Sequence, residues 1–582
     1  MAATNGNDIL STTAAGQTLD GLAGDDQLTS NYNNTWLIGR DGSDLLTTDV
    51  RFILGQVATG SAKQSGGSGD DSLSAYLSVS AGSANIDQDG GTGNDKISAY
   101  AYDSSGLSLL GMVDSNIHIS GGAGDDDIYI TNNIVTSTGG TVRNVISGGT
   151  GNDTINVSSE TTPFGAYSSA AYAGSGSLAT NTVDGGNGND FMTAVARGLA
   201  QGDVVSNDIT GGSGDDNVLS TTISDTDGSS IHAQNNVSGG DGNDKISAYH
   251  YAGSSLPGSL HVDAASDVTD VLSGGNGDDY ISALSDTRGA DNGSTAFHKL
   301  QGDGGNDTLI SRIDATTSGH FLEAVLLGGT GNDTLDAKIA VKVDLLLNTL
   351  ANPYLYNTLE GGAGNDNLTA RITLDYDFHD NFHGQFASLV NTLTGGAGND
   401  TLDASIDENE NAVPSNLTFS SNVLSGGAGD DVLIGHVNST VAYVQALSSL
   451  DGGAGNDQLT VFGGYNNSLN GGTGNDRLTG GSGYDLFTGG SGADTFVFVG
   501  RSDSGNAFNN ADQINDFNAR QGDRIDLTAL GITAADLMIT HHSGIGYNTN
   551  YTASVDFDRN GTVDFAIDVQ SAQTLVSANF IF

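Results

Sequence analysis

The chain has 582 residues, of which 86 are Gly, 4 are Pro and none is Cys, so disulfides and thiolate metal sites are excluded. Asp and Glu number 70 against 18 Lys and Arg, and the resulting net charge of -52 would repel nucleic acids and anionic membrane surfaces. The N-terminal MAATNGNDIL has no signal-peptide pattern and no run of about 18 apolar residues occurs, so neither Sec export nor membrane insertion is predicted.

One sequence motif recurs along most of the chain. It consists of an apolar residue, any residue, Gly-Gly-x-Gly-(Asn/Asp)-Asp, any residue, and a second apolar residue. In the copy NTLTGGAGNDTLDA, Leu393 precedes the glycines and Asp400 is followed by Leu402. Intact or degraded copies end at Asp8, Asp26, Asp44, Asp71, Asp95, Asp126, Asp153, Asp190, Asp216, Asp244, Asp279, Asp307, Asp333, Asp366, Asp400, Asp431, Asp457, Asp476, Asp485 and Asp494. The turn is nearly constant, whereas the segments between copies vary in length.

The glycines of this motif permit a tight turn, because Gly adopts positive φ and allows close backbone approach. A constant turn joined to variable segments predicts a chain wound in coils, with the turns stacked along one edge and an opposite loop of free length. We therefore predict an all-β fold, an elongated parallel β-roll or β-helix solenoid with a C-terminal β cap. In chain order, residues 1–62 form degenerate coils, residues 63–496 form the roll with expanded coils, and residues 497–582 form the cap.

The segments on either side of the turn alternate as strands do. In KISAYAY, Ile97, Ala99 and Ala101 share one face, and Tyr100 and Tyr102 share the other. Before the turn, an apolar residue stands two places ahead of the first Gly in well-formed copies, at Ile146, Val183, Ile209, Val237, Leu359, Leu393, Leu424 and Leu469. Both strands of each coil are therefore predicted to turn an apolar column inward.

An Asn lies two residues before each of these apolar positions. These residues are Asn144, Asn181, Asn207, Asn235, Asn357, Asn391, Asn422 and Asn467. The period of two along a strand points them inward together with the apolar residue. We expect them to form amide ladders along the coil axis, with each side chain bonded to those above and below. The alternative is that Asn merely favours a bend.

The recurring Asp and the carbonyls of a Gly-rich backbone form an all-oxygen ligand set, which suits a hard cation better than zinc or copper. Calcium is favoured over magnesium because loop carbonyls give irregular coordination, whereas magnesium requires a strict octahedron. We expect each ion to lie between consecutive turns, where the aspartates of both turns can reach it. All the repeat aspartates named above are therefore predicted ligands of multiple Ca²⁺ ions; the alternative is that they only fill polar turns.

The nonapeptide Gly-Gly-x-Gly-x-Asp-x-apolar-x resembles the repeat of the RTX (repeats-in-toxin) family, which forms a parallel β-roll that binds Ca²⁺ between stacked turns. RTX repeats recur in tandem and place calcium on both edges of the roll. Here only Asp476, Asp485 and Asp494 keep the nine-residue spacing. The resemblance therefore implies one long calcium column and a second, short one near the C-terminal end.

After Asp494 the sequence changes to ADTFVFVGRSDSG and DQINDFNARQGDRIDLTALGI, and it ends in ANFIF. This part resembles the C-terminal module of serralysin-type RTX proteins, which caps the roll and carries the uncleaved signal for type I secretion. The matching residues are Asp494, Phe496, Phe498, Asp512, Ile514, Phe517, Asp523, Ile525, Asp526 and Leu527. The resemblance implies that the type I secretion machinery is a partner and that the protein is secreted, to the extracellular space or the cell surface.

Within this tail, DFDRNGTVDFAI resembles a calcium loop, with Asp556, Asp558, Asn560 and Asp564 at its positions 1, 3, 5 and 9. Its position 12 is Ile567, where such a loop requires Glu. A polar β-turn is therefore favoured at this place.

No catalytic constellation stands out in the sequence. The zinc-protease motif His-Glu-x-x-His is missing, since His379 and His383 have no Glu between them, and no Gly-x-Ser-x-Gly elbow or phosphate-binding loop has a suitable context. Carboxylate pairs such as Asp125 and Asp126 belong to the repeat. Because the repeats also begin almost at Met1, we expect a chain without enzymatic activity.

We expect a secreted calcium-binding structural protein, which folds on calcium binding after export and assembles into a filament, surface layer (S-layer) or biofilm matrix. The first coil, TNGNDIL, begins directly and has an unpaired edge, which favours self-association. The alternative function is a calcium-dependent adhesin or carbohydrate-binding surface protein, and a hidden enzyme is less expected. An adhesin would use the opposite loop from Pro163 to Gly176 or the outward tyrosines Tyr76, Tyr100, Tyr102, Tyr249 and Tyr251. Ordinary cross-strand packing also accounts for these tyrosines.

Overall fold

The computed structural model describes residues 3–52, 59–79, 82–103, 113–136, 140–163, 176–198, 202–224, 231–252, 266–287, 294–316, 321–344, 353–377, 386–410, 417–439, 445–506, 511–542 and 549–582. The loop at 164–175, which was considered for adhesion, and the histidines His379 and His383 lie outside these ranges.

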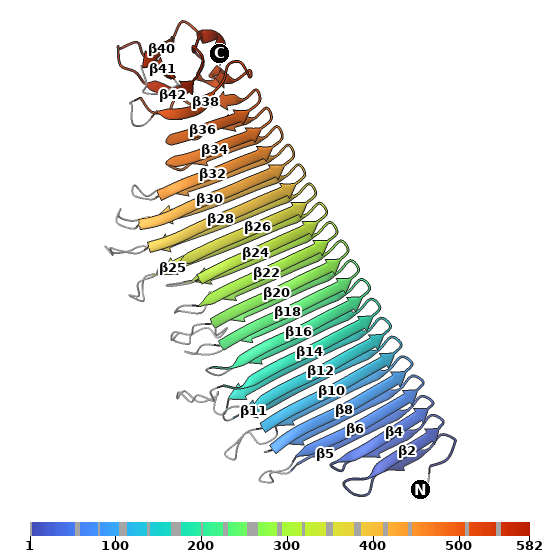
Figure 1. Cartoon of the computed structure of the whole chain (residues 1–582). Helices are drawn as coiled ribbons and strands as arrows, with labels where there is room; N and C mark the ends of the chain where they lie inside the picture. Colours follow the sequence, from blue (N-terminus) through green and yellow to red (C-terminus); the bar gives the residue numbers. More distant parts are fainter. Residues whose placement is uncertain are drawn as a thin grey trace. The chain divides into compact units, whose positions relative to one another are not determined.

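Two compact units are present, Met1–Asp303 and Gly304–Phe582, and each is described by itself. In both units the chain winds in coils of two strands, and the short turn from each even-numbered strand to the next odd-numbered strand lies at one edge (Figure 1). Within the coils, odd-numbered strands pair in parallel with odd-numbered strands, and even-numbered with even-numbered. Each coil therefore adds one strand to each of two parallel sheets, which confirms the predicted all-β parallel roll.

In the first unit the odd-numbered strands are β1 (Ile9–Ser11), β3 (Gln27–Ser30), β5 (Leu45–Arg51), β7 (Ser72–Val79), β9 (Lys96–Asp103), β11 (Asp127–Thr136), β13 (Thr154–Pro163), β15 (Phe191–Gly198), β17 (Asn217–Ser224), β19 (Lys245–Ala252) and β21 (Tyr280–Thr287). The even-numbered strands are β2 (Thr18–Ala23), β4 (Thr35–Asp41), β6 (Gly60–Ser68), β8 (Gly82–Thr92), β10 (Val113–Ala123), β12 (Thr141–Thr150), β14 (Leu178–Asn187), β16 (Val204–Ser213), β18 (Ile231–Asp241), β20 (Ser266–Asn276) and β22 (Thr295–Gly304).

In the second unit the odd-numbered strands of the coils are β23 (Thr308–Thr316), β25 (Thr334–Asp344), β27 (Asn367–Asp377), β29 (Thr401–Glu410), β31 (Val432–Ser439), β33 (Gln458–Gly463), β35 (Arg477–Thr479) and β37 (Thr495–Val497). The even-numbered strands are β24 (Phe321–Thr330), β26 (Tyr354–Ala363), β28 (Phe386–Ala397), β30 (Leu417–Ala428), β32 (Gln445–Ala454), β34 (Asn466–Thr473) and β36 (Tyr484–Ser491). The C-terminal module contains β38 (Asp512–Phe517), β39 (Arg524–Asp526), β40 (Leu537–His542), β41 (Thr549–Val555), β42 (Phe565–Ser571), β43 (Phe580–Ile581) and the short 3₁₀ helices Thr528–Leu530 and Ser577–Asn579.

Equivalent residues of successive coils stand directly above one another. Asn144 on β12 is in register with Asn181 on β14, for example. Ile97 and Ala99 are at most 1% exposed, whereas Tyr102 on the same strand is 50% exposed. The apolar residues predicted to point inward ahead of the turn are all buried. Both strands of each coil thus contribute an apolar column to the core, as the alternation predicted.

The buried Asn residues form the predicted amide ladder in both units. In the first unit, Nδ2 of Asn144 donates to Oδ1 of Asn181 (2.8 Å), and Nδ2 of Asn181 donates to Oδ1 of Asn207 (2.8 Å). In the second unit, Asn357 donates in the same way to Asn391 (2.9 Å). All these side chains are at most 1% exposed. They bond between coils, so the alternative of a local bend is wrong for them.

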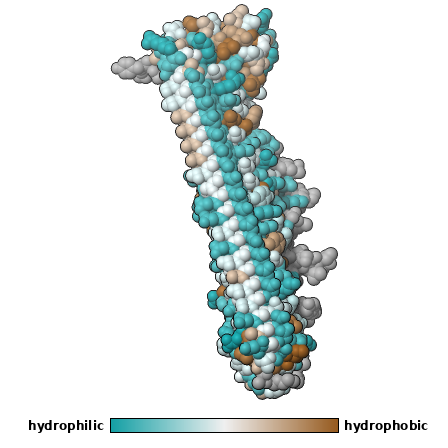
Figure 2. All heavy atoms as spheres, turned by 90° about the vertical axis from the view of Figure 1, so that its right-hand side faces the viewer, coloured by the Kyte–Doolittle hydropathy of each residue, from teal (hydrophilic) through white to brown (hydrophobic). Residues whose placement is uncertain are grey.

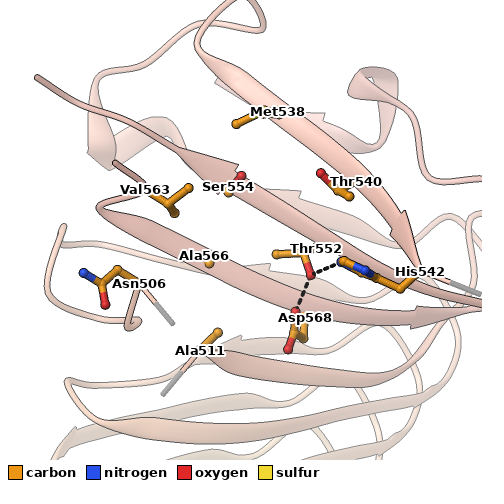
Figure 3. Close-up of a pocket in the computed structure, with 10 residues that line it drawn as sticks. All are labelled: Asn506, Ala511, Met538, Thr540, His542, Thr552, Ser554, Val563, Ala566 and Asp568. Carbon is orange, nitrogen blue, oxygen red and sulfur yellow. Dashed lines mark hydrogen bonds between the residues drawn. The ribbon is translucent and has the colours of Figure 1, made fainter. Parts of the chain in front are cut away.

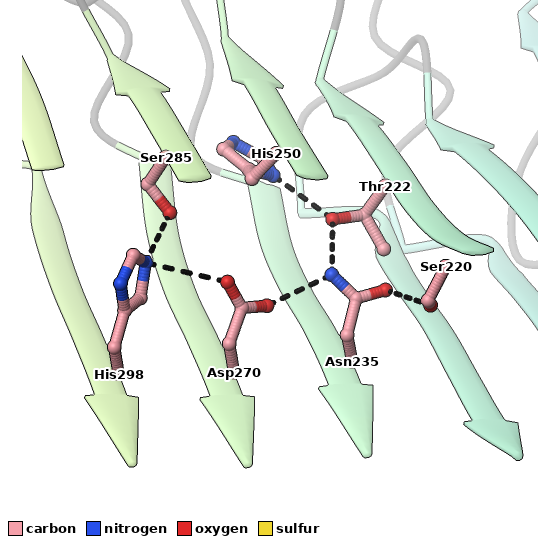
Figure 4. A network of polar contacts seen from close by, with 7 residues as sticks. All are labelled: Ser220, Thr222, Asn235, His250, Asp270, Ser285 and His298. Atoms are coloured by element: carbon pink, nitrogen blue, oxygen red, sulfur yellow. Dashed lines mark hydrogen bonds and ion pairs between the residues drawn. The ribbon is translucent and has the colours of Figure 1, made fainter. Parts of the chain in front are cut away.

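In the first unit this ladder ends at an ionisable pair (Figure 4). Nδ2 of Asn235 donates to Oδ1 of Asp270 (2.8 Å), and Oδ2 of Asp270 lies 3.3 Å from Nε2 of His298. Burial raises the pKa of Asp270 to about 7 and lowers the pKa of His298 to about 3. Burial therefore favours the uncharged forms of both groups at the end of the ladder, because an isolated charge in the core is costly.

The C-terminal module continues one sheet and then covers it. Strand β38 pairs in parallel with β36 and β42, and β42, β41 and β40 continue as an antiparallel sheet. Phe487 packs edge to face against Phe496 and Phe498, and Phe498 packs in the same way against Phe565, with ring centroids 5.7 to 6.1 Å apart. This buried aromatic cluster anchors the predicted β cap to the last coils. Among the described residues, no helix has the length and apolar character needed to cross a membrane.

Substitution of Asn181 tests the amide ladder. Asn181→Ala leaves Nδ2 of Asn144 and Oδ1 of Asn207 buried without this partner. Since each orphaned buried polar group costs about 1–3 kcal/mol, we expect the unfolding free energy to fall by about 2–5 kcal/mol in chemical denaturation. The control Thr180→Ala, on the outward face of the same strand, should change it by less than about 0.5 kcal/mol. Equal effects of the two substitutions would contradict the ladder.

Candidate metal centre

The glycine pattern of the turns is explained by the closeness of successive coils. In the turn 148–153, Gly149 has φ 112° and Gly151 has φ 128°. A Cβ on Gly149 would lie 2.0 Å from the carbonyl oxygen of Gly122, and a Cβ on Gly151 would lie 2.0 Å from that of Gly124. Only Gly permits both the positive φ and this approach to the preceding coil.

The repeat aspartates form a hydrogen-bonded column at this edge. The backbone N–H of Asp126 donates to Oδ1 of Asp153 (2.8 Å), and that of Asp153 donates to Oδ1 of Asp190 (2.7 Å). In the first unit the column contains Asp8, Asp26, Asp44, Asp71, Asp95, Asp126, Asp153, Asp190, Asp216, Asp244 and Asp279. In the second unit it contains Asp307, Asp333, Asp366, Asp400, Asp431, Asp457, Asp476, Asp494 and Asp523. Every predicted aspartate except Asp485 therefore lies in one of these columns.

In most column aspartates the second carboxylate oxygen is buried and accepts no hydrogen bond. This holds for Oδ2 of Asp26, Asp44, Asp71, Asp95, Asp126, Asp153, Asp190, Asp216, Asp244, Asp333, Asp366, Asp400, Asp431, Asp457, Asp476 and Asp494. A Cβ placed on Gly148 would lie 2.3 Å from Oδ2 of Asp153 and 2.6 Å from the carbonyl oxygen of Gly185 in the next coil. The first Gly of the repeat thus leaves a small space that is lined by oxygens of two coils.

Burial makes these carboxylates difficult to ionise in the absence of a cation. It raises the pKa of Asp126 and Asp216 to about 7 and that of Asp153 to about 6. Hydrogen bonds from the backbone of the preceding coil act in the opposite direction, whereas repulsion between neighbouring aspartates adds to the rise in pKa. At neutral pH the column therefore favours either protons or a bound cation.

These features fit calcium bound between coils. The space beside the first Gly presents carboxylate and carbonyl oxygens, which are the donors that calcium prefers, and a divalent ion would compensate the buried charges. The residues that would hold it are the aspartates of two successive coils together with the carbonyl groups of the first glycines. Figure 2 faces the turn edge, where hydrophilic residues form continuous rows along each unit.

A second ladder, not predicted from the repeat, runs beside the aspartate column. It is formed by the residue just before each column aspartate, which we call the fifth turn residue. The N–H of Asn94 donates to Oδ1 of Asp70 (2.9 Å), that of Asp125 to Oδ1 of Asn94 (3.0 Å), and that of Asn152 to Oδ1 of Asp125 (2.8 Å). The preference for Asn or Asp at this place of the repeat was its sequence signal, because both side chains offer an Oδ1 acceptor.

Asp485 belongs to a second, short column at the opposite edge, as the tandem copies implied. Its N–H donates to Oδ1 of Asp512 (2.8 Å), and its own Oδ1 accepts Nδ2 of Asn467 (2.7 Å), so Asn467 bonds to a carboxylate rather than to another Asn. Oδ2 of both aspartates is buried without a hydrogen bond. Burial raises the pKa of Asp485 to about 7 and that of Asp512 to about 9, and Asp503 nearby adds to both shifts. This place has the same features as the main column and can hold calcium in the same way.

Asp512 and Asp523 extend the two columns but were not among the predicted ligands. Neither follows a Gly-Gly-x-Gly segment, so the sequence associated them only with the C-terminal module. Both keep the Asp-x-apolar ending of the repeat, through Ile514 and Ile525, which are completely buried. That ending was the signal that could have identified them.

Two predicted positions differ from the main pattern. Oδ2 of Asp8, the first column aspartate, already accepts the N–H of Thr4 (2.6 Å). In the C-terminal module, the segment that resembles a calcium loop makes turn hydrogen bonds, such as that from the N–H of Gly561 to Oδ2 of Asp556 (2.7 Å), and carboxylate oxygens of Asp556, Asp558 and Asp564 lie within 4.8 Å of one another. Its twelfth residue, Ile567, is fully buried in β42 rather than available as a ligand.

A pocket of the C-terminal module lies on the face of β40, β41 and β42 (Figure 3). Nε2 of His542 lies 3.0 Å from Oγ1 of Thr552, and this hydroxyl donates to Oδ1 of Asp568 (2.6 Å). A nucleophilic hydroxyl must give its proton to the imidazole. Here the hydroxyl proton is directed to the carboxylate, so this arrangement differs from that of a hydrolase triad.

Substitution of one column aspartate should have opposite effects with and without calcium. Asp153→Asn keeps the Oδ1 that accepts the N–H of Asp126 but replaces the buried Oδ2 with a neutral amide. In EDTA at neutral pH the variant should be more stable than the wild type, because a buried charge is removed. In calcium it should be less stable by roughly 0.5–3 kcal/mol, because a ligand is lost. Thermal unfolding in both conditions measures this, with the exposed Asp127→Asn as control; effects of the same sign in both would argue against the site.

The stabilisation by calcium should also depend on pH. The folded pKa values of about 6 to 7 lie above the ordinary Asp value of 3.8. Ionisation therefore removes stability from the metal-free chain as pH rises through this range. Calcium holds the ionised form, so its stabilisation should be full above about pH 7 and vanish towards about pH 4. Melting temperatures in calcium and in EDTA should converge on acidification, and parallel curves would contradict this linkage.

Comparisons with known proteins found two matching families and several similar solved structures. Residues 373–582 match the family described as peptidase M10 serralysin C terminal, and residues 3–31, 138–158, 175–194, 266–287, 325–337 and 357–371 match the RTX calcium-binding nonapeptide repeat. Among solved structures, the chain is similar to the AlgE6R3 and AlgE6R2 subunits of a mannuronan C5-epimerase from Azotobacter vinelandii, with 28% and 32% identity. The similarity covers 30% and 27% of this chain and 82% and 91% of those subunits, with TM-scores of 0.18 and 0.16. No curated protein matches the chain.

The repeated turns, the aspartates that meet across successive coils and the C-terminal module lead to one conclusion. The chain belongs to the RTX calcium-binding repeat family, carries a serralysin-type C-terminal module of type I secretion, and is a secreted protein that binds multiple calcium ions.

Proposed function

We propose that this protein is an extracellular structural component, which folds on calcium binding after type I export and assembles with further copies into a filament, surface layer or matrix. The observation that carries this proposal is the uniformity of the coils. From β1 (Ile9–Ser11) to β37 (Thr495–Val497), the described residues of each unit repeat one two-strand coil with the same oxygen-lined turn. Repeat stacks of this kind present long regular surfaces, which suit a scaffold.

Calcium couples this architecture to export. Before export, where calcium is scarce, the buried column aspartates oppose folding because their ionisation is penalised, as the raised pKa of Asp126 and Asp153 indicates. The chain would then remain unfolded and able to pass the secretion machinery. Outside the cell, ion binding would supply folding free energy.

The proposal includes the absence of catalysis. In the first unit, Ser285, His298 and Asp270 come together, but all three side chains are completely buried, so no substrate could reach them. His298 also uses the same atom, Nε2, towards both partners, whereas a catalytic imidazole joins its two partners through different nitrogens. The burial and geometry of this cluster of Ser285, His298 and Asp270 support a structural role for it.

The outer sheet faces offer surfaces for contact between copies. Tyr100 on β9 and Tyr129 on β11 have ring centroids 5.9 Å apart, and the guanidinium of Arg51 lies 5.1 Å from the ring centroid of Tyr76. Tyr129 is 48% exposed. Such a tyrosine group suits lateral packing of another copy. The second candidate function is a carbohydrate-binding adhesin, which the same exposed rings favour because sugars stack on aromatic faces.

Electron microscopy and light scattering test the proposed assembly. In calcium, the purified chain should form ordered particles larger than a monomer, and EDTA should disperse them. Tyr100→Ser combined with Tyr129→Ser should weaken assembly while calcium binding is retained, whereas Thr131→Ser on the same face should not. Monomers alone in calcium would contradict the structural proposal; glycan binding that depends on these tyrosines would then favour the adhesin.

A further inference from the structure

The places for calcium along the two main columns are not equivalent, because the fifth turn residue differs between coils. It is Asn in most coils and Asp in a few. The acidic examples whose own coil and next coil lie in the same unit are Asp25, Asp70, Asp125, Asp215 and Asp430. All of them are exposed, in contrast to the buried column aspartates that follow them. Their Oδ1 atoms accept the hydrogen bonds of the second ladder, and this role does not require their charge.

We call the space between the turns of two successive coils an interval. The side chain of each fifth turn residue points towards the interval between its own coil and the next. Oδ1 of Asp70 accepts the N–H of Asn94 in the next coil (2.9 Å), and Oδ1 of Asp430 accepts the N–H of Asn456 (2.6 Å). An Asn makes the same bond, as Asn365 does with the N–H of Asn399 (2.7 Å). Asp and Asn are therefore interchangeable as ladder acceptors, and they differ only in the negative charge.

The negative charge acts on the two column aspartates that border this interval. Asp70 repels the carboxylates of Asp71, in its own coil, and of Asp95, in the next coil. The same relation holds for Asp25 with Asp26 and Asp44, for Asp125 with Asp126 and Asp153, for Asp215 with Asp216 and Asp244, and for Asp430 with Asp431 and Asp457. For each acidic fifth residue, the hydrogen bond and the electrostatic repulsion thus indicate one and the same interval, the one between its own coil and the next.

In these intervals the charge of the fifth residue adds to the charges of the two column aspartates. The affinity of an oxygen site for calcium rises with its negative charge. We propose that the five intervals bordered by Asp25, Asp70, Asp125, Asp215 and Asp430 bind calcium more tightly than the intervals of the same unit that have a neutral fifth residue, and that they fill first. The proposal rests on calcium-dependent folding, and it makes the acidic fifth residues affinity-setting positions of the stack.

The distribution of these residues gives the proposal a consequence for folding. A coil with a neutral fifth residue separates each from the next: Ser43 follows Asp25, and Asn94 lies between Asp70 and Asp125. Two exposed carboxylates are thus never stacked directly, which would be unfavourable. Intervals with high calcium affinity are spread over both units. Several pairs of coils would therefore bind calcium and stack at low calcium concentration, and the coils between them would stack at higher concentration.

A charge-matched pair of variants of the full chain tests this. The first replaces four acidic fifth residues by Asn, which preserves the ladder acceptor: Asp70→Asn, Asp125→Asn, Asp215→Asn and Asp430→Asn. The control removes four negative charges from outward positions of strands: Asp127→Asn, Asp208→Asn, Asp403→Asn and Asp407→Asn. Calcium binding is followed by calorimetry, and folding by circular dichroism, at low ionic strength.

In the first variant we expect the early phase of binding to disappear and the midpoint of calcium-induced folding to rise about two- to fivefold, the range for exposed charge pairs. The number of ions bound at saturation should stay the same. The control should keep both phases. At about 1 M salt the difference between the variants should vanish, because the screening length falls to about 3 Å.

A gain of charge provides the reciprocal test. Asn365→Asp places a carboxylate beside the interval bordered by Asp366 and Asp400, and it should add one ion to the early phase. Identical titrations of the first variant and the control, or no gain with Asn365→Asp, would overturn the inference while leaving calcium-dependent folding intact. Failure of the unsubstituted chain to bind calcium would instead overturn the proposed function on which the inference rests.

Discussion

The fold depends on aspartates at one edge that are buried in nearly all the described coils and meet across successive coils. A hydrogen bond such as that from the N–H of Asp126 to Oδ1 of Asp153 satisfies one carboxylate oxygen and leaves the other facing backbone oxygens. Such an edge is repulsive when its carboxylates are ionised, and a divalent cation turns the same groups into a link between coils. The Gly residues of the turn serve this edge, because only they let the coils approach so closely.

The interior of the roll is built differently from its metal-binding edge. Its apolar columns pack against one another, and its Asn side chains find hydrogen-bond partners within the protein. Asn144 donates to Asn181, and Asn181 donates to Asn207. Even at the ionisable end of the ladder, burial shifts the pKa values of Asp270 and His298 in the directions that favour their uncharged forms. The core can therefore set the register of the strands whether or not calcium is present. The aspartate edge, by contrast, allows the coils to stack completely only when calcium is bound.

Much of this structure could be predicted because the same motif occurs many times in the sequence, so each feature of the motif is seen in many independent copies. Alternation placed Ile97 and Tyr102 on opposite faces, and a constant turn with variable intervals placed the aspartates in one column. The exceptions have physical causes. Asp512 and Asp523 lack the preceding glycines, and only tertiary stacking shows that they extend the columns. The fifth-residue ladder depends on which backbone N–H lies above each side chain, and the pairing of Asp270 with His298 joins residues of different strands in non-repeated positions.

The most direct test of this account is a crystallographic anomalous difference map of the folded protein grown with calcium. The account predicts peaks between successive column aspartates, for example between Asp126 and Asp153, at the open side of Gly121 and Gly148. A folded roll whose aspartate edge shows no such peaks would contradict it, because the buried carboxylates would then be compensated in another way.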